Sequence, residues 1–143
     1  MSRFAFVKYS YVDVIRKVME ILEADEKPTY YPNDVYGFWV DITDNPAVQV
    51  GWKATTVNTV DWVFSELTYQ DHADEAAAKK QELLTAAVNW LKLNPLQYCV
   101  DLGLATPEEE ALLLAYKQFY VGVARVEKQS GYPYTINWPV VPF

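Results

Sequence analysis

The residues that could do chemistry in this chain are few and stand far apart. His72 is the only histidine, between Asp71 and Asp74, and Cys99 is the only cysteine. A metal site at His72 would need further ligands, and a general base would need an orienting partner. The sequence offers no second histidine and no cysteine near His72 for either role. We therefore interpret His72 as a solvated histidine in a connection between elements. Cys99 lies among apolar residues and reads as a small buried side chain.

The carboxylates are also explained by local structure. Asp41 and Asp44 precede a proline turn, where aspartate usually caps the backbone. The run Glu108–Glu110 suits the positive end of a helix dipole. The chain has no glycine-rich phosphate loop and no Gly-x-Ser-x-Gly elbow. We expect a protein that is not an enzyme and that needs neither a cofactor nor a metal.

Composition narrows the choice of partner. The net charge of −7 argues against nucleic acid, because phosphate binding requires a basic face. No segment reaches the ~18 apolar residues of a membrane helix, and Met1–Phe4 do not begin a signal peptide. We expect no membrane partner and a location in the cytoplasm. With 51% apolar residues in 143, the chain can bury a core as one domain or two small lobes.

The aromatic residues are the most informative set, because more than half of them lie before residue 73. A small lobe has difficulty burying so many rings, and tyrosine and tryptophan anchor protein interfaces. A core role and a partner-binding role remain equally open for them. The candidate partner-binding residues are Tyr36, Phe38, Trp39, Trp52, Trp62 and, near the C-terminus, Trp138.

Most elements of the first half read as strands. Residues 3–9 are rich in aromatic and β-branched residues, which favours a strand. Residues 11–24 carry apolar side chains at helical spacing with charges between them, which predicts an amphipathic helix. Residues 25–34 contain two prolines and form a loop. Three further strands are predicted as an antiparallel meander that packs on this helix, over residues 36–43, 47–54 and 59–67, with a turn at 44–46 and Gly51 as a bulge.

A boundary falls at residues 69–73, after which the chain becomes helical. We expect two domains, 1–72 and 73–143. The first helix of the second domain covers residues 74–93, and Asn94-Pro95 should interrupt it before a further turn at 96–102. Its predicted apolar stripe is Leu83, Leu84, Ala87, Val88 and Leu91.

The last helix has strong start signals. Gly103 suits the residue after a helix end, Thr106 with Glu109 forms a capping box, and Pro107 fits the first helical position. The helix should run from Pro107 to about residue 130 and return antiparallel to its predecessor, making a helical hairpin. Its predicted buried stripe is Leu112, Tyr116, Phe119, Val123 and Val126.

An extended arm, residues 132–143, ends the chain, because Pro133 and Pro139 exclude a continued helix. Trp138 is its largest apolar side chain. The arm either folds back on the hairpin, which we favour, or docks on another chain. The fold class is therefore α+β: a helix and a small antiparallel sheet, then a helical hairpin and an arm.

The order of parts in the second half resembles the tail fibre assembly proteins of tailed bacteriophages and related phage-tail-like particles. Pro95-Leu96-Gln97 leads into Val100-Asp101-Leu102-Gly103-Leu104-Ala105-Thr106 and the acidic run. A Leu-Leu-Leu-Ala-Tyr-Lys helix and the ending Ile136-Asn137-Trp138-Pro139 follow. The resemblance covers about residues 74–142, roughly half of the chain, and the first half matches only loosely.

This resemblance implies a non-enzymatic chaperone that binds the distal part of a trimeric tail fibre protein and helps it fold and assemble in the bacterial host's cytoplasm. Some proteins of this kind remain on the fibre tip. The alternative is a structural component of the fibre tip that stays in the particle.

Overall fold

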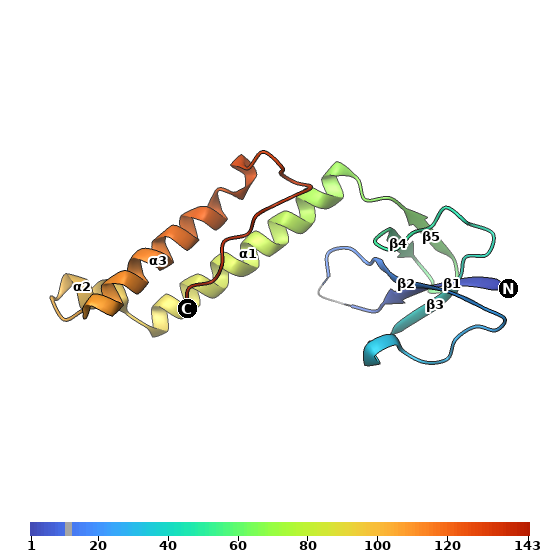
Figure 1. The fold of residues 1–143 in the computed structure, drawn as a ribbon, viewed down its shortest axis with the longest axis horizontal. Helices are drawn as coiled ribbons and strands as arrows, with labels where there is room; N and C mark the ends of the chain where they lie inside the picture. The colour runs from blue at the N-terminus through green and yellow to red at the C-terminus, as the bar shows by residue number, and fades with distance from the viewer. Residues whose placement is uncertain (11–12) are drawn as a thin grey trace. The chain divides into compact units, whose positions relative to one another are not determined.

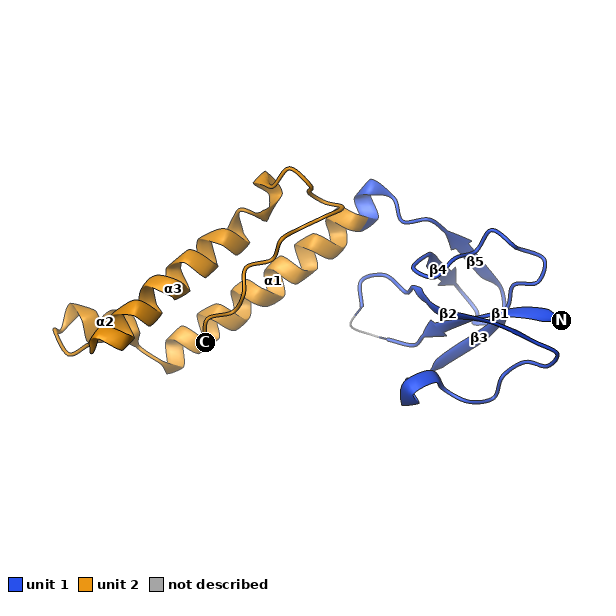
Figure 2. Ribbon diagram, in the orientation of Figure 1, with its two compact units in different colours: residues 1–71 blue, residues 72–143 orange. Residues whose placement is uncertain are grey.

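The computed structural model describes residues 1–10 and 13–143, and its strands all precede residue 72 while most helical residues follow it (Figure 1). Two compact units make up the chain, Met1–Asp71 and His72–Phe143 (Figure 2). The combination of antiparallel sheets with separate helices confirms the predicted α+β class.

β1 (Ser2–Lys8) is the central strand of a three-stranded sheet. β2 (Val18–Ala24) pairs with one edge of β1 and β3 (Gly37–Asp41) with the other, both antiparallel. Side chains of a strand alternate between its two faces. Ala5 and Val7 accordingly lie in one buried cluster and Phe4 and Phe6 in another. The strands predicted over 3–9 and 36–43 are confirmed, the first shifted by one residue to Ser2–Lys8 and the second shortened to Gly37–Asp41.

The amphipathic helix predicted over 11–24 is wrong for the residues that form β2; residues 11 and 12 lie outside the described residues. The apolar spacing of Val18, Ile21 and Leu22 fits a helix but does not exclude a short strand. Pairing with β1 decides the outcome, with Leu22 opposite Phe4 and Ile21 opposite Ala5. A bulge between Phe6 and Val7 accommodates one extra residue in β2, which loosens the alternation that would have indicated a strand.

A second sheet contains β4 (Lys53–Thr56) and β5 (Trp62–Ser65), paired antiparallel. The strand predicted over 59–67 is confirmed in its central part. The three-stranded meander is wrong, because β3 pairs with β1 and not with β4. The strand predicted over 47–54 is confirmed only at its last two residues, and the residues before them form turns.

Arg3 explains why this stretch is folded into turns. Its guanidinium donates to the carbonyls of Pro46 and Val48, at 3.1 and 2.8 Å, and these carbonyls are thereby withdrawn from strand pairing. Gly51 has a φ of +92°, a left-handed conformation that glycine adopts cheaply, so it serves a turn and is not the predicted strand bulge. The turn predicted at 44–46 is present.

The helices are α1 (Tyr69–Leu93), α2 (Leu96–Asp101) and α3 (Pro107–Ala124), followed by a 3₁₀ turn, η2 (Val126–Lys128). α1 begins earlier than predicted, and α3 ends about six residues before its predicted end. The other signals are confirmed. The helix is interrupted at Asn94-Pro95, and Gly103 has a φ of +70°. Thr106 and Glu109 form both hydrogen bonds of the capping box.

α3 returns alongside α1 as a hairpin (Figure 1). Their shared core contains Ala87 from α1 and Tyr116, Phe119 and Val123 from α3. The Tyr116 hydroxyl donates to the Ala87 carbonyl at 3.0 Å. The predicted stripes are largely confirmed, but Leu113 is buried where Leu112 was expected, and Val88 lies at the surface, 37% exposed.

The C-terminal arm folds back on this hairpin, which confirms the favoured prediction. Trp138 and Phe143 pack against the hairpin core, and the Phe143 ring stacks on Trp90 with centroids 4.7 Å apart. Gln129 donates to the Asn137 carbonyl at 2.9 Å and accepts from its N–H at 2.8 Å. The arm is thus held at its middle and at its C-terminal end by its own unit.

Candidate functional site: an aromatic surface on the first unit

β3 places neighbouring aromatic residues on opposite faces of the sheet. Trp39 points into the cluster formed with Phe4 and Phe6, is only 5% exposed, and donates its indole N–H to the Tyr30 carbonyl at 2.8 Å. Phe38 points to the other side, where its ring lies 5.6 Å from Trp62. Trp39 is therefore a core residue in this unit, and Phe38 remains half-exposed.

Phe38 belongs to a continuous chain of rings at the surface. Tyr36 lies 6.3 Å from Phe38 and is 57% exposed. Tyr9 lies 5.7 Å from Tyr36 and 5.9 Å from Phe38, and Tyr31 lies 5.2 Å from Tyr36. Tilted or edge-on pairs at these separations are favourable geometries for aromatic rings. We call Tyr9, Tyr31, Tyr36, Phe38 and Trp62 the aromatic surface.

The structure thus brings together three of the six candidate residues, Tyr36, Phe38 and Trp62. Trp52 and Trp62 both pack against the buried cluster of Ala5 and Val7, and the Trp62 ring in addition contacts Phe38. Trp138 lies in the second unit, where the Lys79 ammonium sits 5.1 Å from its ring centroid.

Sequence reasoning missed Tyr9 and Tyr31 as members of this surface. Tyr9 follows β1, and its N–H donates to the Tyr36 carbonyl at 3.0 Å, which continues the pairing of β1 with β3. The strands predicted over 3–9 and 36–43 are both rich in aromatic residues, which could have indicated that they pair. The predicted meander instead paired β3 with the wrong neighbour. Tyr31 comes from the loop before β3, and no periodicity would have located it.

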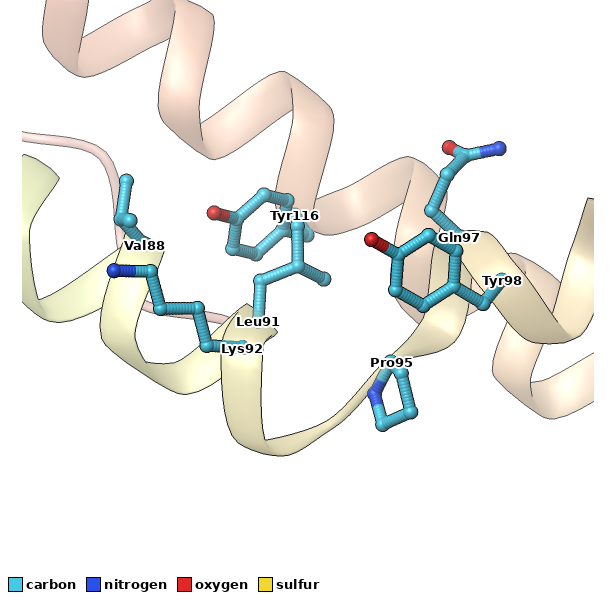
Figure 3. A pocket seen from close by; sticks show the side chains of 7 residues that line it. All are labelled: Val88, Leu91, Lys92, Pro95, Gln97, Tyr98 and Tyr116. Atoms are coloured by element: carbon cyan, nitrogen blue, oxygen red, sulfur yellow. The ribbon is translucent and has the colours of Figure 1, made fainter.

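A second apolar surface lies on the helical hairpin. A pocket of about 300 Å³ opens between the end of α1 and the start of α2, with Leu91, Pro95 and the Tyr116 ring among its walls (Figure 3). Tyr98, which is 71% exposed, closes one side, and Lys92 lies at the rim. Two aromatic residues, Tyr98 and Tyr116, line this pocket, against five in the aromatic surface. None of the six partner-binding residues predicted from the sequence lines it.

The chemically suggestive residues have structural roles. His72 lies in α1, not in a connection, and its ring packs 4.9 Å from Tyr134. Cys99 is half-buried in α2. Within residues 1–10 and 13–143, no three histidine, cysteine or acidic side chains come together as a metal site would require. No helix in the same residues is long and apolar enough to cross a membrane.

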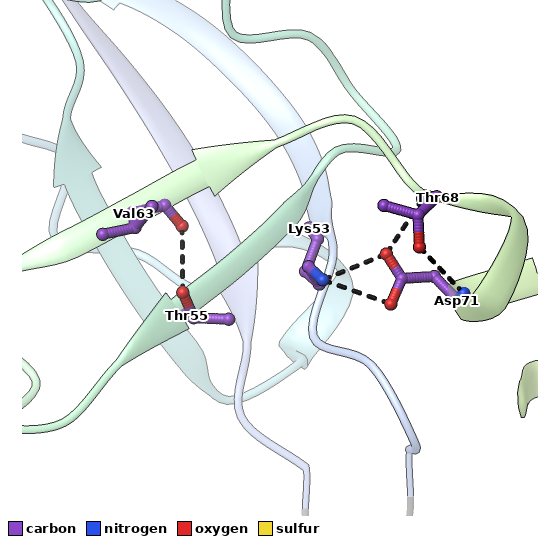
Figure 4. Close-up of polar contacts among 5 residues, drawn as sticks. All are labelled: Lys53, Thr55, Val63, Thr68 and Asp71. Atoms are coloured by element: carbon purple, nitrogen blue, oxygen red, sulfur yellow. Dashed lines mark hydrogen bonds and ion pairs between the residues drawn. The ribbon is translucent and has the colours of Figure 1, made fainter.

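Two aspartates of the first unit are held by hydrogen bonds. Asp71 accepts from the Thr68 N–H at 2.9 Å and from the Lys53 ammonium at 3.0 and 3.1 Å (Figure 4). These contacts hold the pKa of Asp71 below its ordinary value. Thr43 does the same for Asp41, whose pKa is also lowered. Ionised, hydrogen-bonded carboxylates of this kind cap turns and helices and are poor candidates for proton transfer.

Comparison with known proteins gives a consistent assignment. Residues 16–143 match the family described as Caudovirales tail fibre assembly protein, lambda gpK, so the match reaches well into the first unit. A probable tail fiber assembly protein of Shigella phage SfV is 39% identical over 64 residues, or 45% of this chain. The chain spans about a third of that relative's length, 34%. No solved structure matches the chain. Because the family match covers most of its length, this chain belongs to the Caudovirales tail fibre assembly protein family.

Proposed function

We propose that this protein is a non-enzymatic chaperone that binds the distal part of a trimeric tail fibre through the aromatic surface of its first unit. The observation that carries the proposal is the continuous chain of half-exposed rings from Tyr31 through Tyr36 and Phe38 to Trp62. Membership of a tail fibre assembly family supports the choice of partner.

The physical need for such a partner follows from how a trimeric fibre forms. Each fibre chain must meet two copies of itself before its apolar surfaces and strand edges are covered, and until then these surfaces favour aggregation. Contiguous exposed apolar patches on a small protein usually mark interaction sites. The aromatic surface is such a patch, and it covers exposed fibre segments in the host cytoplasm. The net charge of −7 keeps the chaperone itself from aggregating.

The two units divide the work in this proposal. The first, which we propose as a domain of residues 1–72, makes the contact through its rings. The second, residues 73–143, is a hairpin whose apolar stripe is covered by its own arm. Trp39, Trp52 and Trp138 support the two cores and do not touch the fibre.

A pull-down with the purified distal part of the fibre tests the location of the contact. Replacing Tyr36 by Ala removes an exposed ring without opening the core, so we expect fibre binding to fall at least about tenfold, as for a central aromatic contact. Tyr98→Ala is the matched control, since Tyr98 is a tyrosine of the second unit that is even more exposed than Tyr36, 71% against 57%. Circular dichroism should be unchanged in both variants. Loss of binding in Tyr98→Ala with retention in Tyr36→Ala would move the contact to the hairpin pocket.

The order of addition separates a chaperone from a structural tip component. A chaperone raises the yield of soluble trimer when it is present while the fibre folds, and adding it afterwards gives no such gain. A tip component binds folded trimer equally well at any time and leaves the yield of trimer unchanged. Equal yields in the two orders would contradict the chaperone proposal.

A further inference from the structure

β3 is an edge strand of its sheet. The sheet order is β2-β1-β3, and among the described residues no strand other than β1 pairs with β3. The hydrogen bonds at its two ends set which main-chain groups face β1. Ile42 donates to the Arg3 carbonyl at 2.8 Å, and Tyr9 donates to the Tyr36 carbonyl at 3.0 Å. In an antiparallel pair the bonded residues alternate, so Phe38 and Val40 also face β1.

Trp39 and Asp41 consequently direct their main-chain N–H and C=O groups away from β1. Within the described residues, the main-chain groups of these two positions form no hydrogen bond outside the strand ladder. An unpaired main-chain group gains free energy when a partner supplies a hydrogen bond.

A groove of about 260 Å³ lies on this side of β3. Its walls include four consecutive strand residues, Phe38–Asp41. Because alternate side chains point to opposite faces, a cavity that touches all four runs along the edge of the strand and not over one face. Lys27 also lines the groove, as do Val60 and Trp62 from the β4–β5 turn and β5.

We propose that this edge accepts a short extended segment of the fibre chain, which pairs with β3 as an added strand. The inference rests on the proposed function and specifies how the partner is held. Strand addition takes its affinity from main-chain hydrogen bonds and its selectivity from pockets for alternate side chains. The groove adjoins the aromatic surface, since Phe38 and Trp62 belong to both, so a bound segment continues directly onto the exposed rings.

The groove also defines the chemistry of the segment. Side chains that point toward Val60 and Trp62 meet apolar groups, and those that point toward Lys27 and Asp41 meet charged groups. The occupant is therefore an extended segment with alternating apolar and polar residues, the pattern of a strand from a β-rich chain that has not yet found its neighbours.

Amide hydrogen exchange tests the pairing residue by residue. The protein is exchanged alone and bound to the purified distal part of the fibre, then released and read by NMR. Strand addition predicts that exchange of the Trp39 and Asp41 amides slows by about tenfold or more on binding. Phe38 and Val40, already bonded to β1, should change little. Fibre binding with no change at Trp39 and Asp41 would overturn strand addition and leave the proposed function standing.

A pair of variants provides an independent readout. Val60→Asp places a charge in the apolar wall of the groove, whereas Val57→Asp places one in the same turn at a fully exposed position outside the groove. We expect Val60→Asp to weaken fibre binding about tenfold and Val57→Asp to leave it unchanged. Equal binding by both variants would contradict the proposal.

Two further outcomes would also overturn it. If the wild-type protein does not bind the fibre at all, the proposed function fails together with the inference. If the Trp39 and Asp41 amides become protected as protein concentration rises without fibre, the occupant is a second copy of this chain and not the fibre.

Discussion

The Lys53 ammonium and the Thr68 N–H both donate to the Asp71 carboxylate, and the Asp71 N–H in turn donates to the Thr68 hydroxyl. The pair of Thr68 and Asp71 thus caps the first turn of α1, and Lys53 ties that turn to β4 (Figure 4). The contact between Thr68 and Asp71 is local in sequence, whereas Lys53 reaches Asp71 from 18 residues away, a contact that a short sequence window does not reveal.

Asp71 gives a prediction about pH. Its pKa is lowered in the folded protein, from an ordinary value of 3.8, so its ionised form stabilises the fold. That contribution is fully present above pH 3.8 and is lost as the pH falls through the lower folded-state pKa. Asp71→Asn should therefore be less stable than the wild type at neutral pH, with a difference that shrinks below pH 3.8.

Urea denaturation across this pH range measures the difference. Asp44→Asn is the control, because Asp44 is exposed and makes no ion pair or hydrogen bond among the described contacts. A pH-independent difference between the wild type and Asp71→Asn would show that the carboxylate charge is not what stabilises the turn.

Phe119 gives a prediction about packing. It is 3% exposed in the hairpin core and meets the Phe143 ring edge-on at 5.8 Å. Phe119→Ala removes these contacts and leaves a cavity, so the free energy of unfolding should fall by about 3–5 kcal/mol. Leu114→Ala, on the exposed face of the same helix, should change it by no more than about 0.5 kcal/mol. Thermal melting of both variants checks this, and equal melting temperatures would refute the assigned stripe.

The local signals that start and end single helices were readable from the sequence, and the pairings between distant strands were not. Thr106 and Glu109 are three residues apart and cap α3 by themselves, so their motif predicted the helix start. β2 becomes a strand through its pairing with β1, a contact that a helical apolar spacing at Val18, Ile21 and Leu22 conceals. The aromatic surface has the same origin: Tyr9 and Tyr36 meet because β1 pairs with β3, across residues distant in sequence.

The arm contributes to the stability of the second unit. It places Trp138 and Phe143 on the hairpin core and pairs Asn137 with Gln129. Truncation after Gln129 uncovers this apolar surface, so the protein should lose a few kcal/mol of stability and bind the dye ANS. Trp138→Ala should show a smaller loss of the same sign. A truncated protein that melts like the wild type would contradict the role of the arm as part of the core.

At the scale of the whole molecule, the protein joins an aromatic contact surface in one unit to a self-contained helical hairpin in the other, on a chain of net charge −7. These properties support the proposed holding chaperone, since the rings are accessible and the described carboxylates with lowered pKa values are engaged in caps or ion pairs. The proposed function requires that the aromatic surface assists the folding and assembly of the fibre.

The most direct measurement is the yield of soluble trimeric fibre on co-expression with the wild type, with Tyr36→Ala, or with Tyr98→Ala. We predict that the wild type and Tyr98→Ala raise the yield equally, because the rings of the first unit are intact in both. Tyr36→Ala should leave the yield near that of the fibre expressed alone, although the variant itself folds. A full yield with Tyr36→Ala, or no gain with the wild type, would contradict the account.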